Sequence, residues 1–214
     1  MKKGIFLVSI LLVPSIIYLL FSLGQHNMAK LGYYGEFDQL DEMGDSLVFP
    51  VNVPALNVAN IDDFGEDDLK DRVVLMHLFQ WPCDDQCIDN IATLNNYLNR
   101  VGLNEEWTLL SICRDSISQK ELEDLSVKNM YKGGNWHFAT SPNHRELVDA
   151  LFIRTQRASS ISDIVSTEVV LLDQSKRVRG FFDLRFQQDN KLMQDAIKVL
   201  IQEPHVKWKN KEKR

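Results

Sequence analysis

Residues 73–87 read VVLMHLFQWPCDDQC and contain a strand, the point where it ends and the start of a helix. Val73–Phe79 is an uninterrupted β-prone apolar run, which predicts a central strand buried on both faces. Trp81-Pro82-Cys83 ends this strand. Apolar residues then recur at helical spacing over Asp85–Val101, which predicts an amphipathic helix. Cys83 and Cys87 are therefore placed at a strand–helix junction.

The chain continues in the same alternating pattern on the carboxyl side of this junction. We predict further strands and helices, including a closing hairpin, at Val51–Val58 (strand), Trp107–Cys113 (strand), Ser118–Met130 (helix, with Ser118 and Glu121 spaced as a capping box), Trp136–Ala139 (strand), Asn143–Phe152 (helix), Glu168–Asp173 with Val178–Phe182 (hairpin) and Asp189–Ile201 (helix). This order predicts the α/β class, with a mixed, largely parallel central sheet flanked by helices on both faces. A βαβ half followed by a ββα half is the arrangement of the thioredoxin-like fold.

The N-terminal segment has the pattern of a membrane helix. Lys2 and Lys3 precede Gly4–Gly24, a run without a charged residue, and about 20 apolar residues in a helix span a bilayer core. No small-residue cleavage site follows the run, which favours a retained signal-anchor over a cleaved signal peptide. The positive-inside rule then exports the rest of the chain. We expect a single-pass protein of the cytoplasmic membrane with its C-terminal domain on the extracytoplasmic (periplasmic) side.

The predicted organisation has four parts. Residues 1–24 are the transmembrane anchor, 25–49 a juxtamembrane linker, 50–202 the thioredoxin-like domain, and 203–214 a basic tail. Of the net charge of −6, the two N-terminal lysines contribute +2 and the tail +3, so the remainder carries −11. An acidic body argues against a nucleic-acid partner. The tail is either a solvated extension or a contact with anionic lipid or an acidic partner.

Cys83 and Cys87 are the candidate functional residues. If the helix begins near Asp84, the two sulfurs lie one turn apart near its N-terminus, which suits either a disulfide or two thiolates on one metal. The helix N-terminus favours a thiolate, and thiolates suit Cu(I). Asp84 and Asp85 oppose this by raising the thiol pKa, and one of them can cap the helix. With three Cys in all, a disulfide scaffold is excluded.

The chain resembles the SCO/SenC family of membrane-anchored, thioredoxin-like copper proteins from about Tyr33 to Ile201. Short matches occur in the order and spacing of the family at Tyr33-Tyr34-Gly35, the Cys83-x-x-x-Cys87 motif, Leu110–Asp115, Trp136–Thr140, and Leu171–Asp173 followed by Arg179–Asp183. The resemblance implies copper binding by the Cys83 and Cys87 thiolates with one distant His. It also implies copper delivery to, or cysteine reduction in, the copper-site subunit of cytochrome oxidase. Another exported thiol protein is the alternative partner.

The chain departs from this pattern at the distant His. The expected position is Val165, and residues 159–168, SSISDIVSTE, contain no His. Among the other histidines, His77 is predicted to be a hydrogen-bonded core residue and His144 to start a surface helix, while His26 adjoins the membrane and His205 lies in the tail. None of them is a natural substitute, and His137 is the least unsuitable. Cys113 is either a small buried hydrophobe or a third sulfur beside the pair.

Three functions stay open from the sequence. The first is copper delivery through the CxxxC pair during cytochrome c oxidase assembly. The second is thiol–disulfide exchange without copper, in which Cys83 attacks a partner disulfide and Cys87 resolves the mixed disulfide. The third is a non-catalytic assembly or interaction module.

Overall fold

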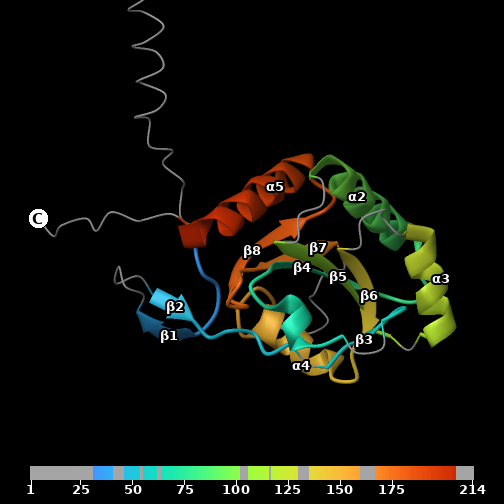
Figure 1. The fold of residues 1–214 in the computed structure, drawn as a ribbon, viewed down its shortest axis with the longest axis horizontal. Helices are drawn as coiled ribbons and strands as arrows, with labels where there is room; N and C mark the ends of the chain where they lie inside the picture. Colours follow the sequence, from blue (N-terminus) through green and yellow to red (C-terminus); the bar gives the residue numbers. More distant parts are fainter. Residues whose placement is uncertain are drawn as a thin grey trace, which may run out of the picture.

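A six-stranded mixed sheet forms the centre of the molecule (Figure 1). The computed structural model describes residues 31–40, 46–53, 55–61, 64–101, 106–115, 117–129, 135–159 and 167–205. In spatial order, the strands of the sheet are β3 (Asn57–Val58), β6 (Trp136–Thr140), β5 (Trp107–Cys113), β4 (Val73–Phe79), β7 (Glu168–Leu172) and β8 (Val178–Asp183).

The strand directions make this sheet mixed, as predicted. β4 pairs in parallel with β5, aligning Phe79 with Cys113, and β5 pairs in parallel with β6. β7 runs antiparallel to β4, aligning Leu172 with Val74, and the β7–β8 hairpin and β3 add the other antiparallel pairings. The expectation of a largely parallel sheet is wrong. Three of the five strand pairings are antiparallel (β3 with β6, β4 with β7, and β7 with β8), and two are parallel.

Helices cover both faces of the sheet (Figure 1). Alternate residues of β4 point into two separate cores: Val73 and Leu75 into one, Val74 and Met76 into the other. The first core is shared with α2 (Asp85–Val101), α3 (Gln119–Asn129) and α5 (Gln187–Gln202). The second is shared with η1 (Glu66–Leu69), α4 (His144–Val148) and the π-helical turn η2 (Asp149–Ile153). β4 and β5 are buried along their whole length, as two-sided covering requires.

Some elements differ from the sequence prediction. The stretch 25–49, expected as a linker, contains the antiparallel strands β1 (Phe37–Leu40) and β2 (Ser46–Val48) in its described part. The expected strand over Val51–Val58 is reduced to β3. The predicted capping box of α3 is confirmed: the Ser118 amide donates to Glu121 Oε2 at 3.0 Å, and the Glu121 amide donates to Ser118 Oγ at 3.3 Å.

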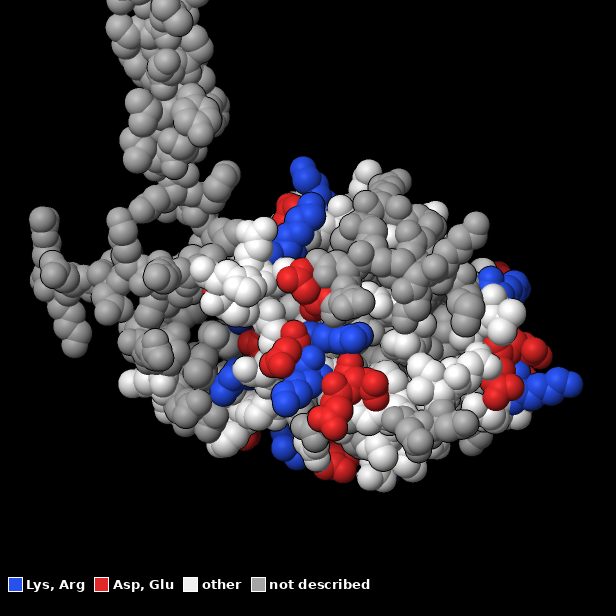
Figure 2. All heavy atoms as spheres, viewed as in Figure 1, with Lys and Arg blue, Asp and Glu red and all other residues white. Residues whose placement is uncertain are grey.

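The expected anchor and residues 206–214 of the tail lie outside the described residues. No helix within the described ranges has the length and apolar character that crossing a membrane requires. On the face shown in Figure 2, the acidic and basic side chains of the described residues are interspersed.

Candidate functional site

Cys83 and Cys87 form a disulfide at the junction between β4 and α2, with their Cα atoms 5.3 Å apart. Both predicted site residues are therefore brought together. Cys87 lies on the inner side of α2 and is 2% exposed, whereas Cys83 is only partly buried. Since an attacking thiolate must reach one of the two sulfurs, Cys83 is the accessible member of the pair.

Asp84 fixes the start of α2 between the two cysteines. Its Oδ1 accepts the Cys87 amide at 2.9 Å, and its backbone carbonyl accepts the Ile88 amide at 3.0 Å. The Gln80 side chain donates to Asp84 Oδ2 at 3.0 Å. This is N-cap geometry, and it confirms the prediction that one Asp of the pair caps the helix. The cap holds Cys87 in the first turn of α2, one turn beyond Cys83.

An acidic residue just past β5 holds the residue that precedes Pro82. The Trp81 amide donates to Asp115 Oδ2 at 2.9 Å, and Glu121 of α3 lies near the Trp81 side chain. Hydrogen bonds from Ser118, with a smaller contribution from Trp81, lower the pKa of Glu121. Neither Asp115 nor Glu121 was predicted as a site residue. The signal available for Asp115 is its position just past β5, since parallel strands end at the same edge of a sheet.

Cys113 is a buried hydrophobic residue, as the first of its two interpretations held. It is 2% exposed and aligned with Phe79 across β4 and β5. Burial raises the pKa of the Cys113 thiol, and a hydrogen bond from the Asp115 backbone only partly offsets this. Within the described ranges, no group of three or more His, Cys, Asp or Glu side chains is placed to hold a metal ion. The alternative, a third sulfur beside the pair, stays a prediction.

Two of the described histidines, His77 and His137, are packed against neighbouring side chains. His77 is fully buried and its Nδ1 lies 3.3 Å from Ser111 Oγ, which confirms a hydrogen-bonded core residue. Trp136 and Phe138 point into the core that contains Cys87, so the intervening His137 points to the opposite face of the sheet. There its ring lies 5.2 Å from that of Phe64, and burial lowers its pKa. His137 is therefore not a substitute for the missing imidazole.

The fold and the site define a thioredoxin-like domain with a CxxxC disulfide. The possible metal ligands of this site are two sulfurs, one on a buried residue and one on an accessible residue. When reduced, two thiolates suit Cu(I) as a cargo, but the imidazole that suits Cu(II) is absent from residues 159–168. The arrangement fits thiol–disulfide exchange without any further ligand.

No protein-family model matches the chain, and no curated protein matches its sequence. Solved structures share its fold. BsSco, a Sco-family cytochrome c oxidase assembly protein in which a disulfide switch was identified, has a TM-score of 0.53 at 15% identity, covering 83% of this chain and 98% of that one. A SCO1/SenC family lipoprotein from Bacillus anthracis str. Ames has a TM-score of 0.52 at 16% identity, covering 78% of this chain and 95% of that one.

A candidate electron transfer protein from Aquifex aeolicus VF5 has a TM-score of 0.52 at 12% identity, covering 80% of this chain and 94% of that one. The structural neighbours of this chain thus include SCO/SenC proteins, as the sequence resemblance suggested.

Proposed function

We propose that this chain is a membrane-anchored, SCO-like protein that acts in cytochrome c oxidase assembly through thiol–disulfide exchange at Cys83 and Cys87. The observation that carries the proposal is the disulfide itself, in which an accessible Cys83 is joined to a buried Cys87. The likeness of fold to BsSco, a cytochrome c oxidase assembly protein with a disulfide switch, supports the kind of partner. The partner is the copper-site subunit of the oxidase or another exported thiol protein.

The exchange balances within the chain and its partner. A partner thiolate attacks Cys83 Sγ, the Cys83–Cys87 bond breaks, and Cys87 leaves as a thiolate that takes up a proton. The second partner thiolate then attacks the partner sulfur of the mixed disulfide and releases Cys83. The partner dithiol loses two electrons and the cysteine pair gains them. In the reverse direction, reduced Cys83 attacks a partner disulfide and Cys87 resolves the intermediate.

The local structure assigns different tasks to the two sulfurs. Cys83 is reachable from solvent, so it forms the intermolecular bond. Cys87 is buried on the first turn of α2, where the helix dipole stabilises the thiolate that leaves. Asp84 and Asp85 work against both thiolates by their charge, which favours the disulfide form of the pair.

Trapping of the intermediate tests this assignment in the full chain. With Cys87→Ser, a peptide disulfide should accumulate as a mixed disulfide on Cys83, because no second thiol is placed to resolve it. Cys83→Ser should form no such adduct. Cys113→Ser, the matched control at the buried third cysteine, should exchange at the wild-type rate. Exchange that persists when both Cys83 and Cys87 are replaced would overturn the proposal.

Copper delivery is the second candidate, because a reduced CxxxC pair offers two thiolates to Cu(I). Titration of the reduced full chain with Cu(I), beside Cys83→Ser, separates the two functions. Stoichiometric binding that Cys83→Ser abolishes would support delivery. Its absence, together with trapping on Cys83, would leave exchange as the function. We further propose the location expected above: a single-pass protein of the cytoplasmic membrane with its domain on the extracytoplasmic side.

A further inference from the structure

A polar groove of about 740 Å³ lies between α2 and α5, which are neighbours on one face of the sheet (Figure 1). The side chains along its two walls are polar, and one of them is charged: Thr93 and Asn96 from α2, and Gln187, Gln188, Lys191 and Gln194 from α5. Sites for small molecules have volumes of about 300–1,000 Å³, but most of them are lined by apolar residues. This lining therefore indicates a ligand that is recognised by hydrogen bonds.

Two buried polar atoms of residues that line the groove have no hydrogen-bond partner among the described residues. They are the Tyr97 hydroxyl oxygen and Asn190 Oδ1. Tyr97 is 4% exposed, and its ring packs edge-on against Trp107 with the ring centroids 5.9 Å apart. The Asn190 amide is oriented by the bond from its Nδ2 to the Leu184 carbonyl at 3.1 Å, which leaves Oδ1 to accept. Because an unpaired buried polar group is costly, a donor and an acceptor held in this way indicate a contact with a ligand.

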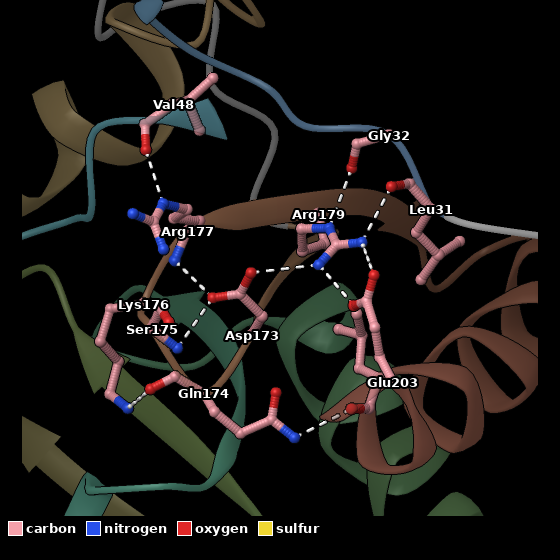
Figure 3. A network of polar contacts seen from close by, with 11 residues as sticks. Leu31, Gly32, Val48, Asp173, Gln174, Ser175, Lys176, Arg177, Arg179 and Glu203 are labelled. Carbon is pink, nitrogen blue, oxygen red and sulfur yellow. Dashed lines mark hydrogen bonds and ion pairs between the residues drawn. The ribbon is translucent and has the colours of Figure 1, made fainter. Parts of the chain in front are cut away.

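Both walls of the groove are held in place by contacts at the helix ends. α2 begins at the Asp84 cap. The last turn of α5 is held because the Gln174 side chain donates to the Leu200 carbonyl at 2.9 Å. Just beyond α5, both oxygens of the Glu203 carboxylate accept hydrogen bonds from Arg179, at 2.7 and 2.9 Å (Figure 3). The groove is therefore largely preformed, as sites for small molecules usually are.

The charges around the groove disfavour an anionic ligand. Lys191 is the one charged residue in the lining. Burial, with a smaller contribution from the charge of Asp195, raises the pKa of Tyr97. The Tyr97 hydroxyl therefore stays protonated and can donate, and an anion beside it would be repelled by Asp195.

The lining also lacks the features by which domains recognise peptides. Peptides bind along a sheet edge, in an apolar groove or against exposed aromatic rings. Here the two walls are helices, whose backbone groups are hydrogen-bonded internally, and the aromatic residue in the lining, Tyr97, is buried. A small, uncharged ligand with many hydroxyl groups fits the lining better.

We propose that the groove between α2 and α5 binds a neutral sugar, whose hydroxyl groups pair with the Tyr97 hydroxyl, Asn190 Oδ1 and the amides of Asn96, Gln188 and Gln194. A sugar hydroxyl, like water, both donates and accepts, so it can replace water in the groove without leaving a hydrogen bond unmade. Each Asn or Gln amide offers two donors and an acceptor to neighbouring hydroxyls. This site uses neither cysteine, so the inference is independent of the proposed exchange.

Saturation-transfer difference NMR on the full chain tests the site, in a detergent without sugar groups. Glucose and N-acetylglucosamine should each give a saturable signal from which a dissociation constant is obtained. Tyr97→Phe removes one oxygen atom and should weaken sugar binding about threefold to tenfold, the loss expected for one hydrogen bond. The matched control, Tyr34→Phe, changes an exposed tyrosine outside the groove and should leave the dissociation constant unchanged.

A second variant blocks the groove instead of removing a hydrogen bond. Thr93→Trp fills the space beside Tyr97 and should abolish sugar binding, whereas Val127→Trp, at an exposed position on α3, should leave it unchanged. Thermal unfolding of each variant shows whether the domain stays folded, and Tyr97→Phe keeps the test valid if the bulkier Thr93→Trp chain does not fold.

Three results would overturn the proposal. The first is the absence of a saturable signal from either sugar. The second is sugar binding that Tyr97→Phe leaves unchanged, because the sugar would then lie elsewhere on the chain. The third is binding of N-acetylglycine N-methylamide, a model of the peptide backbone, without binding of either sugar, which would assign the groove to a peptide.

Discussion

Replacement of Arg179 should destabilise the domain more than that of any exposed arginine. The side chain is 1% exposed, and all five of its N–H groups are used: by the Leu31 and Gly32 carbonyls, by Asp173 Oδ2 at 3.1 Å and by both oxygens of Glu203. Its guanidinium also lies 4.1 Å from the centroid of the Tyr33 ring. Burial works to lower the pKa of Arg179, but Glu203, Tyr33 and Asp173 outweigh it and raise the pKa.

The size of the stability loss follows from the two carboxylates that Arg179→Met leaves without a cation. Asp173 and Glu203 are only 8% and 14% exposed, so two carboxylates would lose their cation in a poorly solvated place. Loss of one partner of a buried ion pair costs about 3–5 kcal/mol. At about 2–4 °C per kcal/mol for a domain of this size, the midpoint of thermal unfolding should fall by roughly 6–20 °C.

The control for Arg179 is an exposed ion pair of similar length. Arg154 lies 3.1 Å from Asp149, with side chains 60% and 42% exposed, so Arg154→Met should cost less than about 1 kcal/mol. Thermal and urea unfolding of the full chain, followed by circular dichroism, give both values. Adding Glu203→Gln to Arg179→Met should restore part of the loss by removing an unpaired charge. An Arg179→Met chain as stable as Arg154→Met would refute the reasoning.

Three further expectations concern single side chains. Although burial works against it, hydrogen bonds from Arg185 lower the pKa of Asp183, so Asp183→Asn should reduce urea stability at about pH 7. That cost should vanish as the pH falls through the folded pKa, below about 3.9; a cost unchanged in acid would contradict the assignment. Tyr97→Phe should leave the free energy of unfolding unchanged or raise it, because the buried hydroxyl has no hydrogen-bond partner among the described residues. A loss of more than about 1 kcal/mol in that free energy would show that the hydroxyl does have a partner. Asp115→Ala removes the acceptor of the Trp81 amide, so dithiothreitol should reduce the disulfide about threefold to tenfold faster. An unchanged rate would show that this hydrogen bond does not hold the segment between β4 and α2 in place.

The sequence predicted those elements that are determined by residues close to one another in the chain. The apolar runs of β4 and β5 are buried strands because both faces of each are covered, which a continuous run of Val, Leu and Ile indicates. The Ser118 and Glu121 capping box acts over three residues, so its spacing in the sequence is enough to identify it. The polar turn after Asp173 is likewise closed by Asp173 itself, whose Oδ1 accepts the Ser175 and Arg177 amides at 2.9 Å.

The parts that escaped prediction depend on contacts between distant segments. Arg179 holds carbonyls that lie 147 and 148 positions earlier in the chain, and no periodicity links an arginine to a backbone carbonyl. The β1–β2 hairpin lies in a polar, mixed stretch whose composition predicts a linker, and the hydrogen bond that joins it to the domain, from Arg177 to Val48, spans 129 positions. Asp115 was missed as a support of Trp81 because the two meet only when β4 and β5 align in register.

The features around the cysteines fit the proposed exchange better than a site with a third metal ligand. Cu(II) favours imidazole, and His137 faces away from the pair while residues 159–168 contain no histidine. What the structure provides instead is the Asp84 cap that positions Cys87, the Asp115 contact that holds the residue before Pro82, and a burial difference between the two sulfurs. The proposed exchange can use each of these, because one sulfur must be attacked while the other leaves, and none of them requires a metal. A site with two sulfurs and no imidazole therefore fits the proposed cysteine redox role. If the reduced pair binds copper, the ion it suits is Cu(I), carried as a cargo.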